Sequence, residues 1–244
     1  MRVELAPAFI LHRRAWRDTS YLLEAFTREH GRVGLIARGA RRARGRWQGL
    51  LEPLVALQLS WAGRGELKTL TGIEVTARFE LTGNRLWSGF YANELVLRLT
   101  AREDPHAAIH DALHGLLQTM AAGAPGVLAL RYFERDLLQA IGYGLSLTVT
   151  ANGQPIRSGR QYIWHAAGGL TEGGAGDDGV AVPGSALLDL AAGTLHQRAD
   201  IHAVRALLGA AIAPHLGERP LQTLQTLRAM RQFRATPSTS GQSP

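Results

Sequence analysis

The segment 21–37, with the sequence YLLEAFTREHGRVGLIA, decides the fold class at the start of this chain. Its two apolar runs, 21–26 and 33–37, are rich in aliphatic and aromatic side chains that favour strands, and the turn signal His30-Gly31 separates them. Similar apolar runs recur at 8–11, 54–59 and 67–75. Five short strands within residues 1–80 predict a five-stranded OB-fold barrel.

The period of the apolar residues changes after Thr82-Gly83-Asn84. Trp87, Tyr91, Leu95 and Leu99 recur at every fourth position, which predicts a buried helix. Prolines open the next two expected helices, which begin near residues 104 and 125, and the last of them ends at 142–144. Further helices are expected at 183–192, 201–217 and 220–233. We therefore assign 81–144 and 183–235 to one all-helical domain in two parts.

Between these two parts, residues 145–182 return to strand-like sequence and end in a stretch rich in glycine. Strands are expected at 145–150 and 162–165, which predicts a small β insertion. The small polar residues of 236–244 predict a disordered tail. The complete chain is therefore expected to have an α+β fold.

Composition limits the function classes. The chain has 244 residues and a formal net charge of +7, with 14 basic and 8 acidic side chains in residues 1–80 against 13 and 12 in the remainder. The excess of positive charge at the N-terminal end indicates a polyanion-binding surface there. The absence of cysteine excludes disulfides and thiolate metal sites. Because no long apolar stretch is present, we expect a cytoplasmic protein without a membrane partner.

The run RGARRARGRW at 38–47 is the strongest functional signal in the sequence. Arginine can bind two phosphate oxygens at once, and Gly39 and Gly45 are expected to let the backbone approach a nucleic-acid strand closely. The arginines of this run predict a phosphate-binding loop between the third and fourth strands. They are Arg38, Arg41, Arg42, Arg44 and Arg46.

Two tryptophans lie next to arginines and are candidates for stacking on bases. Trp47 follows Arg46, and Trp16 lies among three arginines. OB-fold barrels hold single strands by stacking bases on aromatic rings beside a basic groove. The sequence does not decide which of the two tryptophans stacks. The predicted DNA-binding set is completed by Arg13, Arg14, Arg17 and Lys68.

Signatures of catalysis are missing from the sequence. His106, His110 and His114 are four residues apart, but the first and third lie roughly 12 Å apart along a helix and cannot share one metal ion. No set of carboxylates suits two-metal phosphoryl chemistry, and neither a Walker motif nor Gly-x-Ser-x-Gly occurs. We therefore expect neither an enzyme nor a metal site or cofactor.

The third helix suggests a second binding surface. Arg131 and Arg135 flank Tyr132-Phe133, so a cationic group beside an apolar groove is suited to an acidic peptide with a hydrophobic end. An ordinary amphipathic helix with solvent-exposed arginines would show the same pattern.

Eight motifs in this order resemble the bacterial RecO family of recombination mediators. They are AFILHRRAWRDTS (8–20), FTREHGRVGLIARGAR (26–41), LLEP (50–53), GRGELKTL (63–70), WSGFYANEL (87–95), RYFE (131–134) with GYG (142–144), and LGERPL (216–221). The resemblance spans nearly the whole chain. It implies an N-terminal OB domain, a helical domain and an inserted lobe resembling a zinc finger.

The resemblance also implies a function in DNA repair and recombination without catalysis. Members of this family bind single- and double-stranded DNA, anneal complementary strands, bind the acidic tail of single-stranded DNA-binding protein (SSB), and with RecR help to load RecA. Arg38, Arg41 and Arg42 match the family's basic loop, and Arg131 is expected to border the SSB-tail pocket, together with Phe133 and Arg135. A cytoplasmic, nucleoid-associated location follows.

Two departures from the family pattern affect these expectations. Some members carry four cysteines in the lobe that matches 145–182, whereas this chain has none, so its lobe must fold without zinc. Gln222-Thr223 follow the final motif, where a basic residue and a serine are usual. Two other functions remain open at this point: an RNA-associated OB-fold protein and a metal-dependent nuclease.

Overall fold

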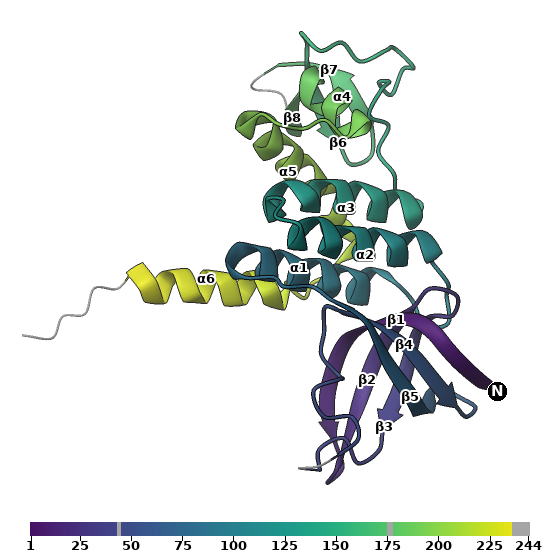
Figure 1. Ribbon diagram of the computed structural model, residues 1–244. Helices are drawn as coiled ribbons and strands as arrows, with labels where there is room; N and C mark the ends of the chain where they lie inside the picture. Colours follow the sequence, from purple (N-terminus) through teal and green to yellow (C-terminus); the bar gives the residue numbers. More distant parts are fainter. Residues whose placement is uncertain (43–44, 175–177, 236–244) are drawn as a thin grey trace, which may run out of the picture.

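In the computed structural model, residues 1–42, 45–174 and 178–235 are described (Figure 1). The N-terminal part is a closed barrel of five strands: β1 (Arg2–Trp16), β2 (Ser20–Thr27), β3 (Gly31–Ala37), β4 (Val55–Ala62) and β5 (Leu67–Arg78). Their order is β1-β2-β3-β5-β4, and only β3 and β5 of this barrel run parallel. This confirms the predicted barrel.

The first strand is longer than its apolar run 8–11 suggested. Its first half pairs with β4, from Arg2 opposite Ala62 to Ala8 opposite Leu57, and its second half pairs with β2. β1 therefore closes the barrel by pairing with both β2 and β4. The alternation of apolar residues could not reveal the pairing with β4. The barrel interior is filled by Ile10, Leu23, Leu35, Leu57 and Trp61.

Three helices lie above the barrel as a packed layer in Figure 1: α1 (Gly83–Leu99), α2 (Ala107–Ala121) and α3 (Gly126–Ala140). The second begins after the position expected from Asp104-Pro105. The preceding segment is instead held against the barrel, where the Glu103 amide donates to the Arg32 carbonyl oxygen at 3.0 Å. Gly31 has φ +63°, and a Cβ there would lie 2.1 Å from the Asp104 carbonyl oxygen. This close approach requires glycine.

The inserted lobe contains a small antiparallel sheet of β6 (Gln161–His165), β7 (Gly169–Glu172) and β8 (Val180–Pro183), in the order β7-β6-β8. The expected strand at 145–150 is wrong. That segment turns back on itself, because the Gly153 amide donates to the Thr150 carbonyl oxygen at 2.9 Å and the Ile156 amide to that of Thr148 at 2.8 Å. Only an isolated bridge between Val149 and Pro155 remains.

The chain then forms α4 (Gly184–Ala192), α5 (Arg198–Ile212), a 3-10 turn (Ala213–His215) and α6 (Gln222–Ala235). The helix expected at 201–217 ends earlier because Pro214 lacks the amide hydrogen that an α-helix needs. The side chain of Glu94 accepts hydrogen bonds from the amides of Gln222 and Thr223 at 2.7 and 2.9 Å. Thr223 also donates its hydroxyl to Glu94 Oε2 at 2.7 Å, so Glu94 stabilises the start of α6.

Apolar packing continues from the barrel into the helices. Phe9, Leu11 and Phe26 of the barrel belong to the same buried cluster as the helices and the small sheet. The division of the chain at 80, 144 and 182 therefore stays a prediction. Among the described residues, no helix has both the length and the apolar character needed to cross a membrane. The expected tail at 236–244 lies outside these residues.

Candidate nucleic-acid interface

The end of the barrel drawn lowest in Figure 1 is built from two connections, the β1–β2 turn and the longer β3–β4 loop. The Arg41 amide donates to the Thr19 carbonyl oxygen at 2.9 Å. The Arg41 guanidinium donates to the Arg17 carbonyl oxygen at 3.1 Å. These two bonds join the segments, so the arginines of both connections belong to one surface.

Five of the predicted DNA-binding arginines are exposed on this surface. They are Arg14, Arg17, Arg38, Arg41 and Arg42. Within the described parts of the chain, none of their side chains forms an ion pair with a carboxylate. One carboxylate, that of Asp18, is exposed in the same β1–β2 turn, but within the described chain these five guanidinium groups have no ion-pair partner. We call this surface the barrel-end arginine cluster.

A concave site of about 600 Å³ lies within the barrel-end arginine cluster. It combines three guanidinium groups with one aromatic and one aliphatic side chain, and no carboxylate belongs to its described lining. The lining residues are Trp16, Arg17, Thr19, Ser20, Ile36, Arg38, Gly39 and Arg42. Phosphate groups and an aromatic base are both suited to such a surface.

Trp47 does not offer the stacking surface predicted for it. Its side chain is only 5% exposed and belongs to the barrel core. The indole Nε1 donates to the Arg38 carbonyl oxygen at 3.2 Å, and the Arg46 guanidinium lies 3.8 Å from the ring centroid. Arg46 also donates to the Thr71 carbonyl oxygen at 2.7 Å. The loop thus folds over Trp47, which anchors it, and Trp16 is left as the half-buried candidate.

Two further predicted residues are neutralised by carboxylates. The Lys68 side chain is 7% exposed, and its Nζ lies 2.5 Å from Glu103 Oε1. This ammonium lowers the pKa of Glu103. Arg13 donates to Glu52 Oε1 at 2.7 Å and to the Leu51 carbonyl oxygen at 3.0 Å. Because each cation already has a carboxylate partner, we do not count Arg13 or Lys68 in the barrel-end arginine cluster.

Gly45, the second glycine of the arginine run, also has a different role from the one expected. A Cβ at Gly45 would lie 2.7 Å from the Gly39 carbonyl oxygen. Gly45 therefore allows the loop to pack on itself, and close approach of a nucleic-acid strand is not needed to explain it. Arg44 lies outside the described residues.

The residues predicted for an SSB-tail pocket are mostly in the interior. Arg131 is 4% exposed and Phe133 is 2% exposed. Arg131 Nη2 donates to Glu134 Oε1 at 3.0 Å, and burial raises the pKa of Glu134 while the guanidinium opposes that shift. Arg131 and Phe133 are thus inaccessible to a docked peptide, because this turn of α3 faces the other helices. Arg135 is half-buried and donates to the Leu190 carbonyl oxygen at 2.6 Å.

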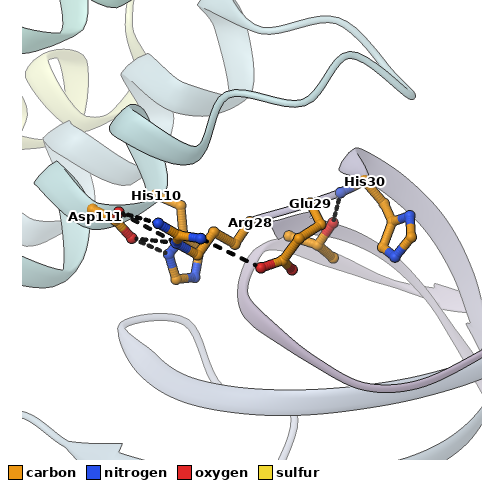
Figure 2. A network of polar contacts seen from close by, with 6 residues as sticks. Arg28, Glu29, His30, His110 and Asp111 are labelled. Carbon is orange, nitrogen blue, oxygen red and sulfur yellow. Dashed lines mark hydrogen bonds and ion pairs between the residues drawn. The ribbon is translucent and has the colours of Figure 1, made fainter.

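A polar network that the sequence did not reveal joins the barrel to α2 (Figure 2). Arg28, directly after β2, donates to both carboxylate oxygens of Asp111, with Nε and Nη2 each 2.9 Å from one oxygen. The Arg28 guanidinium lowers the pKa of Asp111 to about 2. His110 Nδ1 lies 3.3 Å from Asp111 Oδ1, and its ring packs on Phe9 with 5.2 Å between centroids. We call this set the barrel–helix junction.

The histidines of α2 therefore have separate environments. His106 Nε2 lies 3.0 Å from Asp104 Oδ2, His110 is buried, and His114 packs against Phe79. Burial lowers the pKa of His110. In the described ranges of the chain, no group of three or more histidine and acidic side chains is arranged to hold a metal ion.

Comparison with known proteins decides the family. The family "Recombination protein O N terminal" matches residues 1–79, and "Recombination protein O C terminal" matches residues 80–225. The chain belongs to the RecO family. The expected resemblance is thereby confirmed, and it places the chain among proteins of DNA repair and recombination. The N-terminal RecO match coincides with the observed barrel.

Individual RecO relatives agree with this assignment. DNA repair protein RecO of Alkalilimnicola ehrlichii is 42% identical and covers 97% of this chain and 94% of the relative. The RecO protein of Halorhodospira halophila is 42% identical, with 92% of this chain and 97% of the relative covered. That of Nitrosococcus oceani is 42% identical over 96% of both chains. The similarity therefore extends through the barrel, the helices and the inserted lobe.

Proposed function

We propose that this protein is a recombination mediator without catalytic activity, which binds single- and double-stranded DNA and anneals complementary strands. The observation that carries the proposal is the barrel-end arginine cluster, with exposed guanidinium groups that no described carboxylate neutralises. In a RecO family protein of DNA repair, phosphate backbone is the polyanion that such a surface fits.

The geometry supports a simple mechanism for annealing. Arginine side chains on the two joined connections neutralise phosphates from two strands, which lowers the repulsion that opposes pairing. Hydrogen bonds to phosphate carry no sequence information, so the base edges stay available to test complementarity. The bonds from Arg41 to the β1–β2 turn hold the two arginine-bearing segments together before DNA arrives. No covalent step is needed.

Partners are proposed from the family. We expect the protein to act with RecR and the SSB tail and to assist RecA loading indirectly, in the cytoplasm and in association with the nucleoid. Because Arg131 and Phe133 are buried, we expect an acidic tail to contact a cation that is accessible to solvent. Arg135 is the member of the predicted pocket whose side chain is partly exposed, at 28%, and its Nε is paired with Asp136 Oδ1 at 2.8 Å, so an acidic tail would compete with that carboxylate. An Arg135→Glu variant that binds the tail peptide as well as wild type would exclude this contact.

The central test compares wild type with an Arg38/Arg41/Arg42 triple alanine variant. Fluorescence anisotropy of a labelled single strand is measured at several salt concentrations, together with the rate of annealing of complementary strands. Loss of three phosphate contacts is expected to reduce the slope of log affinity against log salt by about 2 and to slow annealing strongly. Structured RNA as a competitor tests the alternative of an RNA-binding protein.

A matched control is available in the inserted lobe and α5. Arg157, Arg160 and Arg198 are also exposed, and their replacement by alanine removes the same charge far along the chain, although Arg160, unlike the cluster arginines, lies 3.4 Å from a carboxylate oxygen of Glu172. This control variant is expected to keep the wild-type salt slope and annealing rate. Annealing that is equally fast in all three proteins would contradict the proposed function.

A further inference from the structure

The concave site in the barrel-end arginine cluster has features that phosphate binding alone does not require. Trp16 and Ile36 contribute apolar surface, and Thr19 and Ser20 contribute hydroxyl-bearing side chains and backbone. Arg17, Arg38 and Arg42 complete the lining with positive charge. A ligand that satisfies all of these groups must combine an aromatic, hydrogen-bonding part with a nearby negative charge, which describes a nucleotide.

The volume and the openness to solvent of this site also suit a nucleotide. About 600 Å³ falls within the range of pockets that enclose small ligands. It is bounded by the β1–β2 turn on one side and the start of the β3–β4 loop on the other. A nucleotide that remains part of a longer strand could therefore enter without leaving the strand.

The walls of the site are held in place before any ligand binds. Arg41 joins the loop to the carbonyl oxygens of Thr19 and Arg17, at 2.9 and 3.1 Å. Arg17 has φ 51° and Gly39 has φ 70°, so both connections turn sharply at the site. The Arg14 guanidinium lies 5.7 Å from the centroid of the Trp16 ring, which restrains the indole. A site with ordered walls loses little entropy on binding.

We infer that this site receives one unpaired nucleobase, which packs against Trp16 while Arg17, Arg38 and Arg42 hold the adjoining phosphates. The inference rests on the proposed function, because it assumes that DNA reaches the barrel-end arginine cluster. Bases of an intact duplex are stacked on their neighbours and are not available to such a site. The site therefore favours single-stranded over double-stranded DNA, whereas the arginines alone bind both.

The test separates bases from phosphates. Anisotropy is measured with three labelled probes of equal length: a thymine single strand, a single strand of abasic nucleotides, and a duplex. Wild type is compared with Trp16→Ala and Trp16→Phe. Trp87→Ala is the matched control, because Trp87 is also half-buried but lies on α1.

Wild type is expected to bind the thymine strand more tightly than the abasic strand. Trp16→Ala should weaken binding of the thymine strand about 5- to 150-fold, the range for one stacked base, and bring it to the level of the abasic strand. Its salt slope should stay unchanged, because no phosphate contact is removed. Trp16→Phe should retain much of the affinity, and Trp87→Ala should bind like wild type.

The outcomes distinguish the inference from the proposed function. If wild type binds thymine and abasic strands equally, a comparison that needs no variant, the base site is excluded while phosphate binding stands. If Trp16→Ala folds normally and keeps the preference for bases, Trp16 is not the stacking residue and the inference is overturned. If wild type binds none of the three probes, the proposed function itself fails.

Discussion

Arginine has opposite roles in the barrel and in the helical region of this molecule. In the barrel-end arginine cluster, five arginines are exposed and no described carboxylate neutralises them. In the helical region, Arg131 is buried and paired with Glu134. Between the two, Arg28 forms an exposed pair with Asp111 across the barrel–helix junction. The comparison shows that partners and burial, more than the residue type, decide whether an arginine stabilises the fold or remains available for phosphate.

The largest effect should come from breaking the buried pair. Glu134→Ala leaves the Arg131 guanidinium uncompensated in the core, and such changes lower the free energy of unfolding by about 3–5 kcal/mol. Urea unfolding followed by circular dichroism measures the loss. Arg42→Ala in the barrel-end arginine cluster is the contrast, with a change expected within about 0.5 kcal/mol. Equal stability of the two variants would contradict the comparison.

The next effect concerns DNA and not stability. Arg42→Ala is expected to weaken single-strand binding several-fold and to lower the salt slope by about 0.7, the contribution of one phosphate contact on a single strand. Arg13→Ala is the control. Arg13 is also an arginine of the barrel, but it is already paired with Glu52 and is therefore not available to phosphate. An anisotropy titration in which Arg13→Ala flattens the slope more than Arg42→Ala would reverse the assignment.

A pH dependence should appear at the barrel–helix junction. Burial lowers the pKa of His110 below its ordinary value of 6.5, although neighbouring Asp111 opposes the shift and His114 and Arg28 add to it. As the pH falls, His110 therefore binds a proton at a higher pH in the unfolded chain than in the folded chain. The stability that neutral His110 contributes is complete well above pH 6.5 and decreases below it, by up to about 1.4 kcal/mol per pH unit.

This dependence can be isolated by comparing His110→Phe with wild type, since phenylalanine keeps the ring packed on Phe9. Thermal unfolding of both proteins is measured between pH 7.5 and about pH 5.5, the range in which an unperturbed histidine titrates. The variant should lose less stability over this range. Parallel curves for the two proteins would show that His110 titrates alike in the folded and unfolded states.

The smallest effect is expected for Arg28→Ala. Its pair with Asp111 is exposed to solvent, so the attraction is weak and is screened by salt. The melting temperature should fall slightly at low ionic strength and match wild type in about 1 M salt, where the Debye length is about 3 Å. A loss that persists in high salt would indicate a packing role for the arginine stem.

Local patterns in the sequence were sufficient for much of the fold. Runs of alternating or continuous apolar residues predicted the barrel strands, and the apolar residues at every fourth position from Trp87 to Leu99 predicted α1. The segment 145–150 was misread because its composition favours a strand, while a turn at Gly153 gives its backbone other partners. The predicted SSB-tail pocket includes two buried residues, Arg131 and Phe133, for a similar reason: neighbours in the sequence say little about partners in space.

The sequence by itself determined the α+β class, the positive N-terminal part and the RecO family, because periodicity, charge and ordered motifs are local properties of the chain. Only the tertiary structure decided which basic groups are available. It buried Trp47, paired Lys68 with Glu103 and Arg131 with Glu134, and joined the β1–β2 turn to the arginine loop. Burial and ion pairing depend on contacts between distant segments, and those contacts exist only once the chain has folded.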